Sequence, residues 1–186
     1  MDSVRVEQLE REGLVSVTWL PFELHPEAPA EGIPREAYFG RGRSLQMRSY
    51  MESVAESVGL TMRQREVIIN SRRALGAAEF AREHGKFEEM HRALFRAHWE
   101  GGGKLEDVDD LARIGGEVGL NAEELRSAIV EDTYAAVIDE NRRMATSAGI
   151  NAIPAHVFGQ RYLVMGAQPY EVLKEVIDKL ALEAGE

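Results

Sequence analysis

The alternation of apolar and polar positions predicts a short helix, one strand and a long loop at the start of the chain. Residues 3–12 carry apolar side chains at helical spacing and are followed by Gly13, a typical helix stop. Residues 15–20 alternate apolar with small polar side chains and are rich in β-branched types, which predicts a strand. Four prolines fall between positions 21 and 34 and exclude a helix interior there. We therefore expect a loop over residues 21–34.

The pattern of residues 35–144 is almost wholly helical. Residues 44–58 and 75–99 each carry apolar side chains along one stripe, and glycines separate the helical pieces. A further helix is expected to begin at Asn121, because a glutamate three residues later completes a sequence that resembles a capping box. Its apolar pattern continues towards Gly149.

The last forty residues change to a pattern of short strands and one helix. Residues 155–158 and 161–164 flank a Gly159–Gln160 turn, which predicts a tight β-hairpin. Pro169 then opens a helix with one apolar face. That face consists of Val172, Leu173, Val176, Ile177 and Leu180.

This order of elements predicts an α/β domain that is interrupted by a helical insertion. A hairpin with one helix is marginally stable alone, so we expect residues 15–20 to pair beside the hairpin in one sheet. The expected α/β domain is discontinuous and comprises residues 1–32 and 145–186. The inserted helical domain is expected to span residues 33–144.

Composition narrows the classes of function. The 22 Lys and Arg residues stand against 32 Asp and Glu, and the net charge of −10 argues against nucleic acid or an anionic membrane as a partner. No stretch approaches the ~18 apolar residues of a spanning helix, and no apolar run of a signal peptide lies near the start. We therefore expect a cytoplasmic protein. The absence of cysteine excludes disulfides, thiol catalysis and thiolate metal sites within this sequence.

Few side chains stand in a pattern typical of catalysis or metal binding. His84, His91 and His98 recur at intervals of seven, which is about 10 Å along a helix, so they cannot share one ion. We predict no metal site and interpret these histidines as a solvated helix face. The glycine run 101–103 does not lead from a strand into a helix, so it is interpreted as a turn and not as a phosphate loop. The polar run 70–73 is either a solvated face or has a structural or substrate-side role.

The segment Gly-Ile-Asn-Ala-Ile-Pro-Ala at residues 149–155 places a proline directly before a strand, where a cis peptide bond is a candidate. With the residues that follow it up to Pro169, this segment resembles the carboxy-terminal part of DsbA-like thioredoxin-fold proteins. Within that family, the segment most resembles a cytoplasmic oxidoreductase branch that is associated with polyketide pathways. This branch is related to hydroxychromene-carboxylate isomerases and kappa-class glutathione transferases. The match extends back through residues 70–75 and the motif Trp-x-Pro-Phe-Glu-Leu-x-Pro at residues 19–26.

This resemblance implies a thioredoxin-like fold, a helical domain that covers a cleft, and three binding residues. Pro154 would be the cis-proline, and the backbone of Ile153 would pair with an extended thiol or disulfide peptide or with glutathione. Gln168 is a weaker candidate for the same cleft, with helix capping as its alternative role. The resemblance implies no bound cofactor other than glutathione.

The chain departs from the family at its beginning. The family starts with a strand and then carries Cys-x-x-Cys, or a serine replacement, at the start of the first helix, where the helix dipole lowers the thiol pKa. Because residues 3–12 resemble the body of that helix, we expect the strand and the active-site turn to precede Met1. Three hypotheses stay open: an oxidoreductase whose start is truncated or misassigned, a thiol-free relative that binds glutathione or a peptide, and an inactive paralogue held in an obligate homo-oligomer.

Overall fold

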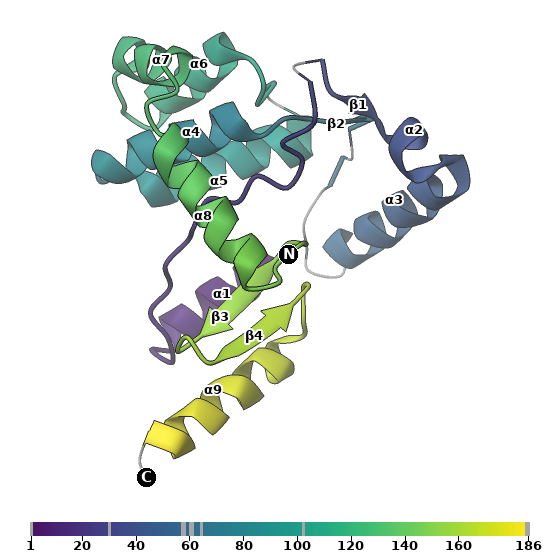
Figure 1. Ribbon diagram of the computed structural model, residues 1–186, viewed down its shortest axis with the longest axis vertical. Helices are drawn as coiled ribbons and strands as arrows, with labels where there is room; N and C mark the ends of the chain where they lie inside the picture. The colour runs from purple at the N-terminus through teal and green to yellow at the C-terminus, as the bar shows by residue number, and fades with distance from the viewer. Residues whose placement is uncertain are drawn as a thin grey trace. The chain divides into compact units, whose positions relative to one another are not determined.

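The computed structural model describes residues 2–29, 31–56, 59, 62–63, 65–101 and 103–184. The chain forms two compact units, one made of Met1–Leu20 with Met144–Glu186 and the other of Pro21–Arg143 (Figure 1). None of the described helices combines the length and the apolar character needed to cross a bilayer.

The first unit brings the two ends of the chain together. Helix α1 (Asp2–Arg11) buries Val6 and Leu9 and ends as the sequence predicts. Gly13 has a φ of 70°, and its N–H donates to the carbonyl of Glu10 over 2.9 Å. The N–H of Leu14 donates to the carbonyl of Leu9 over 3.1 Å, so α1 ends in a Schellman motif.

The hairpin and the last helix complete this unit. Strands β3 (Ala155–Phe158) and β4 (Tyr162–Met165) are antiparallel, and Phe158 lies opposite Tyr162. The loop therefore has three residues, and the expected second strand, 161–164, is wrong by one position. The reason is that the N–H of Arg161 closes the turn on the carbonyl of Phe158 and so does not join the ladder. Helix α9 (Tyr170–Ala184) packs on β3 and buries Leu173 completely.

The strand predicted for residues 15–20 is wrong. These side chains alternate between half-buried and exposed, as a period of two requires, but in the described part of the chain the segment pairs with neither strand of the hairpin. The N–H of Val17 donates instead to the carboxylate of Glu10 over 3.3 Å. Alternating apolar and polar residues indicate which face of an extended segment is buried. A strand also needs a neighbouring backbone with which it can form hydrogen bonds.

The second unit is mainly helical. Figure 1 shows α4 and α5 side by side, with α6 and α7 as a second pair that contacts α4. A short antiparallel pair precedes α4, which the sequence pattern missed because each strand has two residues. The elements are β1 (Ile33–Pro34), α2 (Arg35–Phe39), α3 (Arg41–Glu56), β2 (Val67–Ile68), α4 (Arg72–Glu83), α5 (Phe87–Arg96), the π-helix η1 (Ala97–Gly101), α6 (Val108–Glu117), α7 (Ala122–Val130) and α8 (Ala135–Ser147), of which residues 144–147 belong to the first unit. Of the expected helix 44–58, residues 57 and 58 lie outside the described residues.

Two helices that the apolar pattern predicts as continuous are each divided. The helix expected over 75–99 is broken at Gly85, whose φ of 66° closes α4 in a Schellman motif before α5 begins. The helix from Asn121 begins as expected, because the Asn121 side chain accepts from the N–H groups of Glu123 and Glu124. It is broken before α8 by Asp132, whose φ is 49°. Apolar side chains on both sides of each break face the same core, so the pattern runs through the turn.

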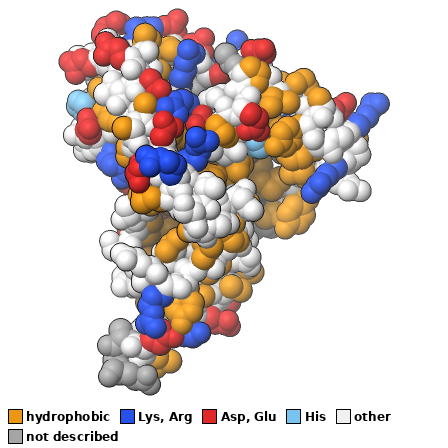
Figure 2. Space-filling model, viewed as in Figure 1, with side chains coloured by type: hydrophobic (Ala, Val, Ile, Leu, Met, Phe, Trp, Pro, Cys, Tyr) orange, Lys and Arg blue, Asp and Glu red, His pale blue; other side chains and the backbone are white. Residues whose placement is uncertain are grey.

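The core of the second unit lies among α4 to α8. A side chain at Gly115 would bring its Cβ within 2.3 Å of Leu125, so α6 and α7 approach closely only because this position is glycine. Figure 2 shows apolar side chains gathered also over α2 and α3, where Tyr38, Leu45 and Tyr50 are exposed. The fully buried large side chains of the core are Met90, Leu111, Leu125 and Ile138.

Arg72 ties together three parts of the second unit. Its Nε donates to Asp132 over 2.8 Å, and its Nη1 donates to Asp139 over 3.0 Å. Nη1 also lies 3.4 Å from the carboxylate of Glu23, which is only 3% exposed. The hydrogen bond from Arg72 lowers the pKa of Asp139. The polar run 70–73 therefore has a structural role, which was one of its two interpretations.

We expect Arg72→Gln to lower the free energy of unfolding by about 2 kcal/mol, because Glu23 would then be a buried carboxylate without a cation. Urea unfolding followed by circular dichroism measures the change. The control is Arg126→Gln, which removes an arginine that pairs with the exposed Asp109 and Glu123 and is expected to cost less than about 0.5 kcal/mol. Equal losses in the two variants would show that the contact with Glu23 contributes nothing beyond a surface ion pair.

Candidate functional site

The loop before β3 forms the site that the sequence singles out. The Ile153–Pro154 peptide bond is cis, as the resemblance implies. The carbonyl of Pro154 accepts a hydrogen bond of 2.8 Å from the N–H of Gly166, which follows β4. The loop is thus fixed to the other strand at the open end of the hairpin, and Pro154 is held at the start of β3.

The backbone of Ile153, next to this proline, makes no hydrogen bond within the described residues. The residue is 52% exposed, and neither its N–H nor its C=O makes a hydrogen bond to any residue within the described ranges. An exposed peptide group with a free donor and a free acceptor can take part in strand addition. The geometry therefore leaves the backbone of Ile153 available for such pairing.

Gln168 is linked to the same loop through Gly166. Its backbone N–H donates to the carbonyl of Gly166 over 2.9 Å, and its side-chain Nε2 donates to the carbonyl of Met165 over 2.8 Å. The carbonyl of Gln168 accepts from Arg5 of α1 over 3.0 Å. Gln168 thus joins the end of β4 to α1, and its amide nitrogen is already engaged.

The amino end of α1 also lies against β3, which the sequence did not reveal. The carboxylate of Asp2 lies 3.2 Å from Nε2 of His156, and both side chains are largely buried. The two residues are 154 positions apart, so no local spacing could have indicated the contact. A carboxylate in the first turn of a helix is also favoured by the helix dipole. The arrangement anchors α1 two residues beyond Pro154.

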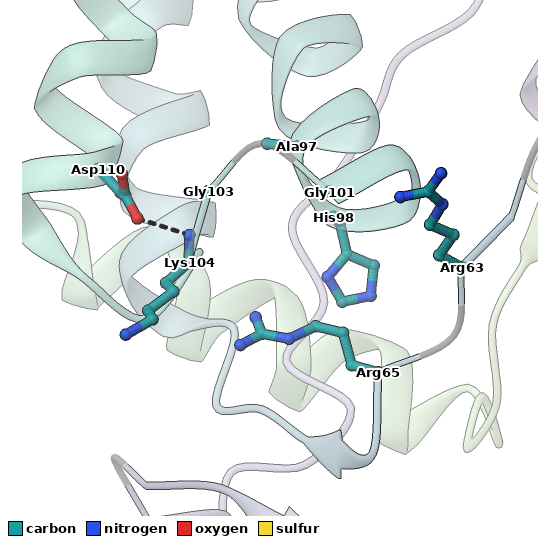
Figure 3. A pocket seen from close by; sticks show the side chains of 8 residues that line it. All are labelled: Arg63, Arg65, Ala97, His98, Gly101, Gly103, Lys104 and Asp110. Atoms are coloured by element: carbon teal, nitrogen blue, oxygen red, sulfur yellow. Dashed lines mark hydrogen bonds between the residues drawn. The ribbon is translucent and has the colours of Figure 1, made fainter.

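A second concave site lies within the helical unit. The cavity has a volume of about 540 Å³, and the basic residues Arg63, Arg65 and Lys104 line it (Figure 3). Figure 3 shows His98 between Arg63 and Arg65. The other lining residues are Ala97, Gly101, Gly103 and Asp110. Of the glycine run that was interpreted as a turn, Gly102 lies outside the described residues.

His98 does not belong to a solvated helix face, so that interpretation is wrong for this residue. It lies in the π-helix η1, which interrupts the α-helical repeat, and it lines the cavity. Its Nδ1 is buried and has no hydrogen-bond partner among the described residues. Burial, followed by the charges of Arg65 and Arg35, lowers the pKa of His98 to about 4.

The other two histidines of that spacing make ordinary packing contacts. His84 lies on Phe80 with ring centroids 4.1 Å apart, and its Nδ1 lies 2.8 Å from the carbonyl of the same residue. His91 lies against Phe87 and Phe95 at 5.5 and 4.7 Å. Across the described residues, no three potential ligand side chains come together as a metal site would require.

Arg65 is held in place by Glu106 at the edge of the cavity. Its Nη1 and Nη2 donate to the two carboxylate oxygens over 2.8 and 2.7 Å, a bidentate pair. Burial is the largest single effect on Glu106 and opposes its ionisation. The hydrogen bonds from Arg65 and from a backbone N–H, together with the charges of Arg65 and Lys104, outweigh burial and lower the pKa of this carboxyl group. The residues are 41 positions apart, so only the fold reveals the pair.

Comparisons with known proteins agree with this architecture. A family model described as a DSBA-like thioredoxin domain matches residues 3–178. Among curated proteins, the chain is 26% identical to the uncharacterized protein YwbO of Bacillus subtilis (strain 168) over 166 residues, which cover 88% of this chain and 81% of YwbO.

Two solved structures are similar over almost the whole chain. The probable DsbA oxidoreductase SCO1869 from Streptomyces coelicolor has a TM-score of 0.85 at 24% identity, with 96% of this chain and 82% of that chain covered. The structure of 2-hydroxychromene-2-carboxylate isomerase has a TM-score of 0.74 at 14% identity, with 99% and 90% covered. At these identities, both structures support the fold and carry no activity over to this chain.

The low pKa of His98 predicts a pH dependence of stability. In the unfolded chain His98 titrates near ~6.5, whereas in the folded chain it titrates at about 4, so between these values the unfolded state binds a proton that the folded state does not. We expect this contribution to lower the free energy of unfolding by about 2 to 3 kcal/mol as the pH falls through that window. Denaturant unfolding of the wild type and of His98→Gln is measured at several pH values. The difference between their free energies of unfolding at each pH gives the contribution of His98. Parallel pH profiles of the two proteins would contradict the prediction.

Proposed function

Because the chain belongs to the family of DsbA-like thioredoxin domains, we propose that it is a non-redox relative that binds an extended peptide or a glutathione-like molecule at Ile153 and Pro154. The fold class predicted from the sequence is confirmed by the family match and by the similar structures. The 186 residues contain no cysteine, so no side chain of this sequence can carry out thiol–disulfide exchange. Binding is the part of the family's function that these residues can support.

The observation that carries the proposal is the unpaired backbone of Ile153. Its N–H and C=O have no hydrogen-bond partner in the described ranges, while the next carbonyl, that of Pro154, accepts a hydrogen bond from the N–H of Gly166. An extended ligand that runs beside Ile153 would exchange hydrogen bonds with it as a short added strand. Recognition of this kind needs no thiol on the protein.

A glutathione-dependent isomerase is the alternative function. It rests on the resemblance of the sequence motifs to hydroxychromene-carboxylate isomerases, whereas the solved isomerase structure, at 14% identity, supports the shared fold alone. We assign no catalytic side chain. The cytoplasmic location and the homo-oligomeric state stay predictions from the sequence.

We expect the amide signal of Ile153 to move downfield and its hydrogen exchange to slow when the protein is titrated with reduced glutathione, because the N–H gains an acceptor. Nuclear magnetic resonance of ¹⁵N-labelled protein measures both effects. S-methylglutathione should bind as well as glutathione, since the backbone makes the contact. Oxidised glutathione serves as the disulfide probe.

Matched variants of Ile153 test the same contact. Ile153→Pro removes the N–H and is expected to weaken binding roughly fivefold or more, whereas Ile153→Val keeps the N–H and is expected to bind as the wild type does. Absence of binding of all three glutathione compounds up to roughly 10 mM would remove the proposal. So would binding that leaves the Ile153 amide unchanged.

A further inference from the structure

Two of the basic side chains that line the cavity in the helical unit, Arg63 and Lys104, form no salt bridge within the described residues. The charge of Lys104 helps to lower the pKa of Glu106 and of Asp110, but both carboxylates are hydrogen-bonded to other groups. Glu106 is held by Arg65, and Asp110 accepts the backbone N–H of Lys104 over 2.8 Å and pairs with Arg113 at 3.3 Å. A locally positive cavity is notable in a chain with a net charge of −10.

His98 lines this cavity and carries a ring nitrogen, Nδ1, that is buried behind the cavity wall without a partner among the described residues. A buried polar atom without a partner costs free energy, and such atoms in a native fold call for an explanation. The π-helix that carries His98 is itself a rare element that is often found at functional sites.

The backbone around the cavity is closely packed and held in place. Gly103 lies close to the side chains of Arg113 and Ile114, and a Cβ at this position would come within 3.2 Å of each. The N–H of Arg63 donates to the carbonyl of Trp99 over 2.7 Å, which fixes the backbone of Arg63 to the π-helix. Two cationic segments are therefore positioned by the fold around a space of about 540 Å³.

We propose that this cavity is a binding site for a small organic anion, whose carboxylate or phosphate groups are held by Arg63 beside His98 and by Lys104 on the other side of the cavity. Arginine and lysine are the residues that recognise such groups, and Arg65 adds positive potential while it stays paired with Glu106. The site lies wholly within the helical unit, so it is independent of the proposal for Ile153.

Binding of an anion should be linked to the titration of His98. The charged groups that act on this imidazole are Arg65 and Arg35, which disfavour its protonation, and Glu106, which favours it. A bound anion adds negative charge beside the ring and therefore raises the pKa of His98 from its value of about 4. By linkage, the anion binds more tightly as the pH falls towards that raised pKa.

Calorimetry of the full chain at neutral pH and low ionic strength tests the site with inorganic phosphate and with succinate as separate probes. Binding of phosphate alone, of succinate alone or of both supports the proposal and identifies the anionic group. We expect Arg63→Gln and Lys104→Gln each to weaken binding about tenfold. The control Arg126→Gln removes an exposed arginine of α7 and is expected to leave binding unchanged.

The titration of His98 in the unmodified protein provides a second readout that does not depend on how the variants fold. Its imidazole signals are followed against pH in sulfate and in chloride at equal ionic strength, with His98→Gln used to assign them. A higher pKa in sulfate is expected. The proposal is overturned if neither phosphate nor succinate binds, if Arg126→Gln weakens binding as much as Arg63→Gln, or if the pKa of His98 is the same in both salts.

Discussion

The burial of Glu23 is the constraint on which the helical unit depends. A carboxylate that is 3% exposed is tolerated only with a cation beside it, and Arg72 at the start of α4 supplies that cation. The same guanidinium contacts Asp132, in the turn before α8, and Asp139, within α8. One side chain therefore fixes the entry loop, the first core helix and the last helix of this unit relative to each other.

The two candidate sites differ in the groups that they present to a ligand. At Ile153 the backbone N–H and C=O are available, and they are held in place because the carbonyl of Pro154 accepts a hydrogen bond from the N–H of Gly166. In the helical unit it offers side-chain charge, with Arg65 fixed by Glu106 and the neighbouring Arg63 left unpaired among the described residues. The first site suits a ligand with an extended backbone, and the second suits a small charged one.

The sequence predicted the elements whose signals are local. The hairpin, the start of α7 at Asn121 and the end of α1 at Gly13 each follow from residues within one turn of the feature. The strand at 15–20 was predicted wrongly because pairing depends on a distant backbone. The position of His98 was missed because a spacing of seven describes an uninterrupted α-helix, whereas Gly85 and the π-helix interrupt this one. The pair of Arg65 with Glu106 depends on packing across 41 residues, which no periodic pattern encodes.

The hydrogen bond between Gly166 and Pro154 has a consequence for variation among related sequences. Gly166 adopts a φ of 80°, which side-chain-bearing residues rarely adopt, and its N–H holds the carbonyl that follows the free peptide group. Position 153 contributes backbone atoms and an exposed side chain. A lineage could therefore exchange the side chain at 153 and retune which ligands are accepted, while position 166 stays confined to glycine. Selectivity and architecture at this site would then evolve at separate positions.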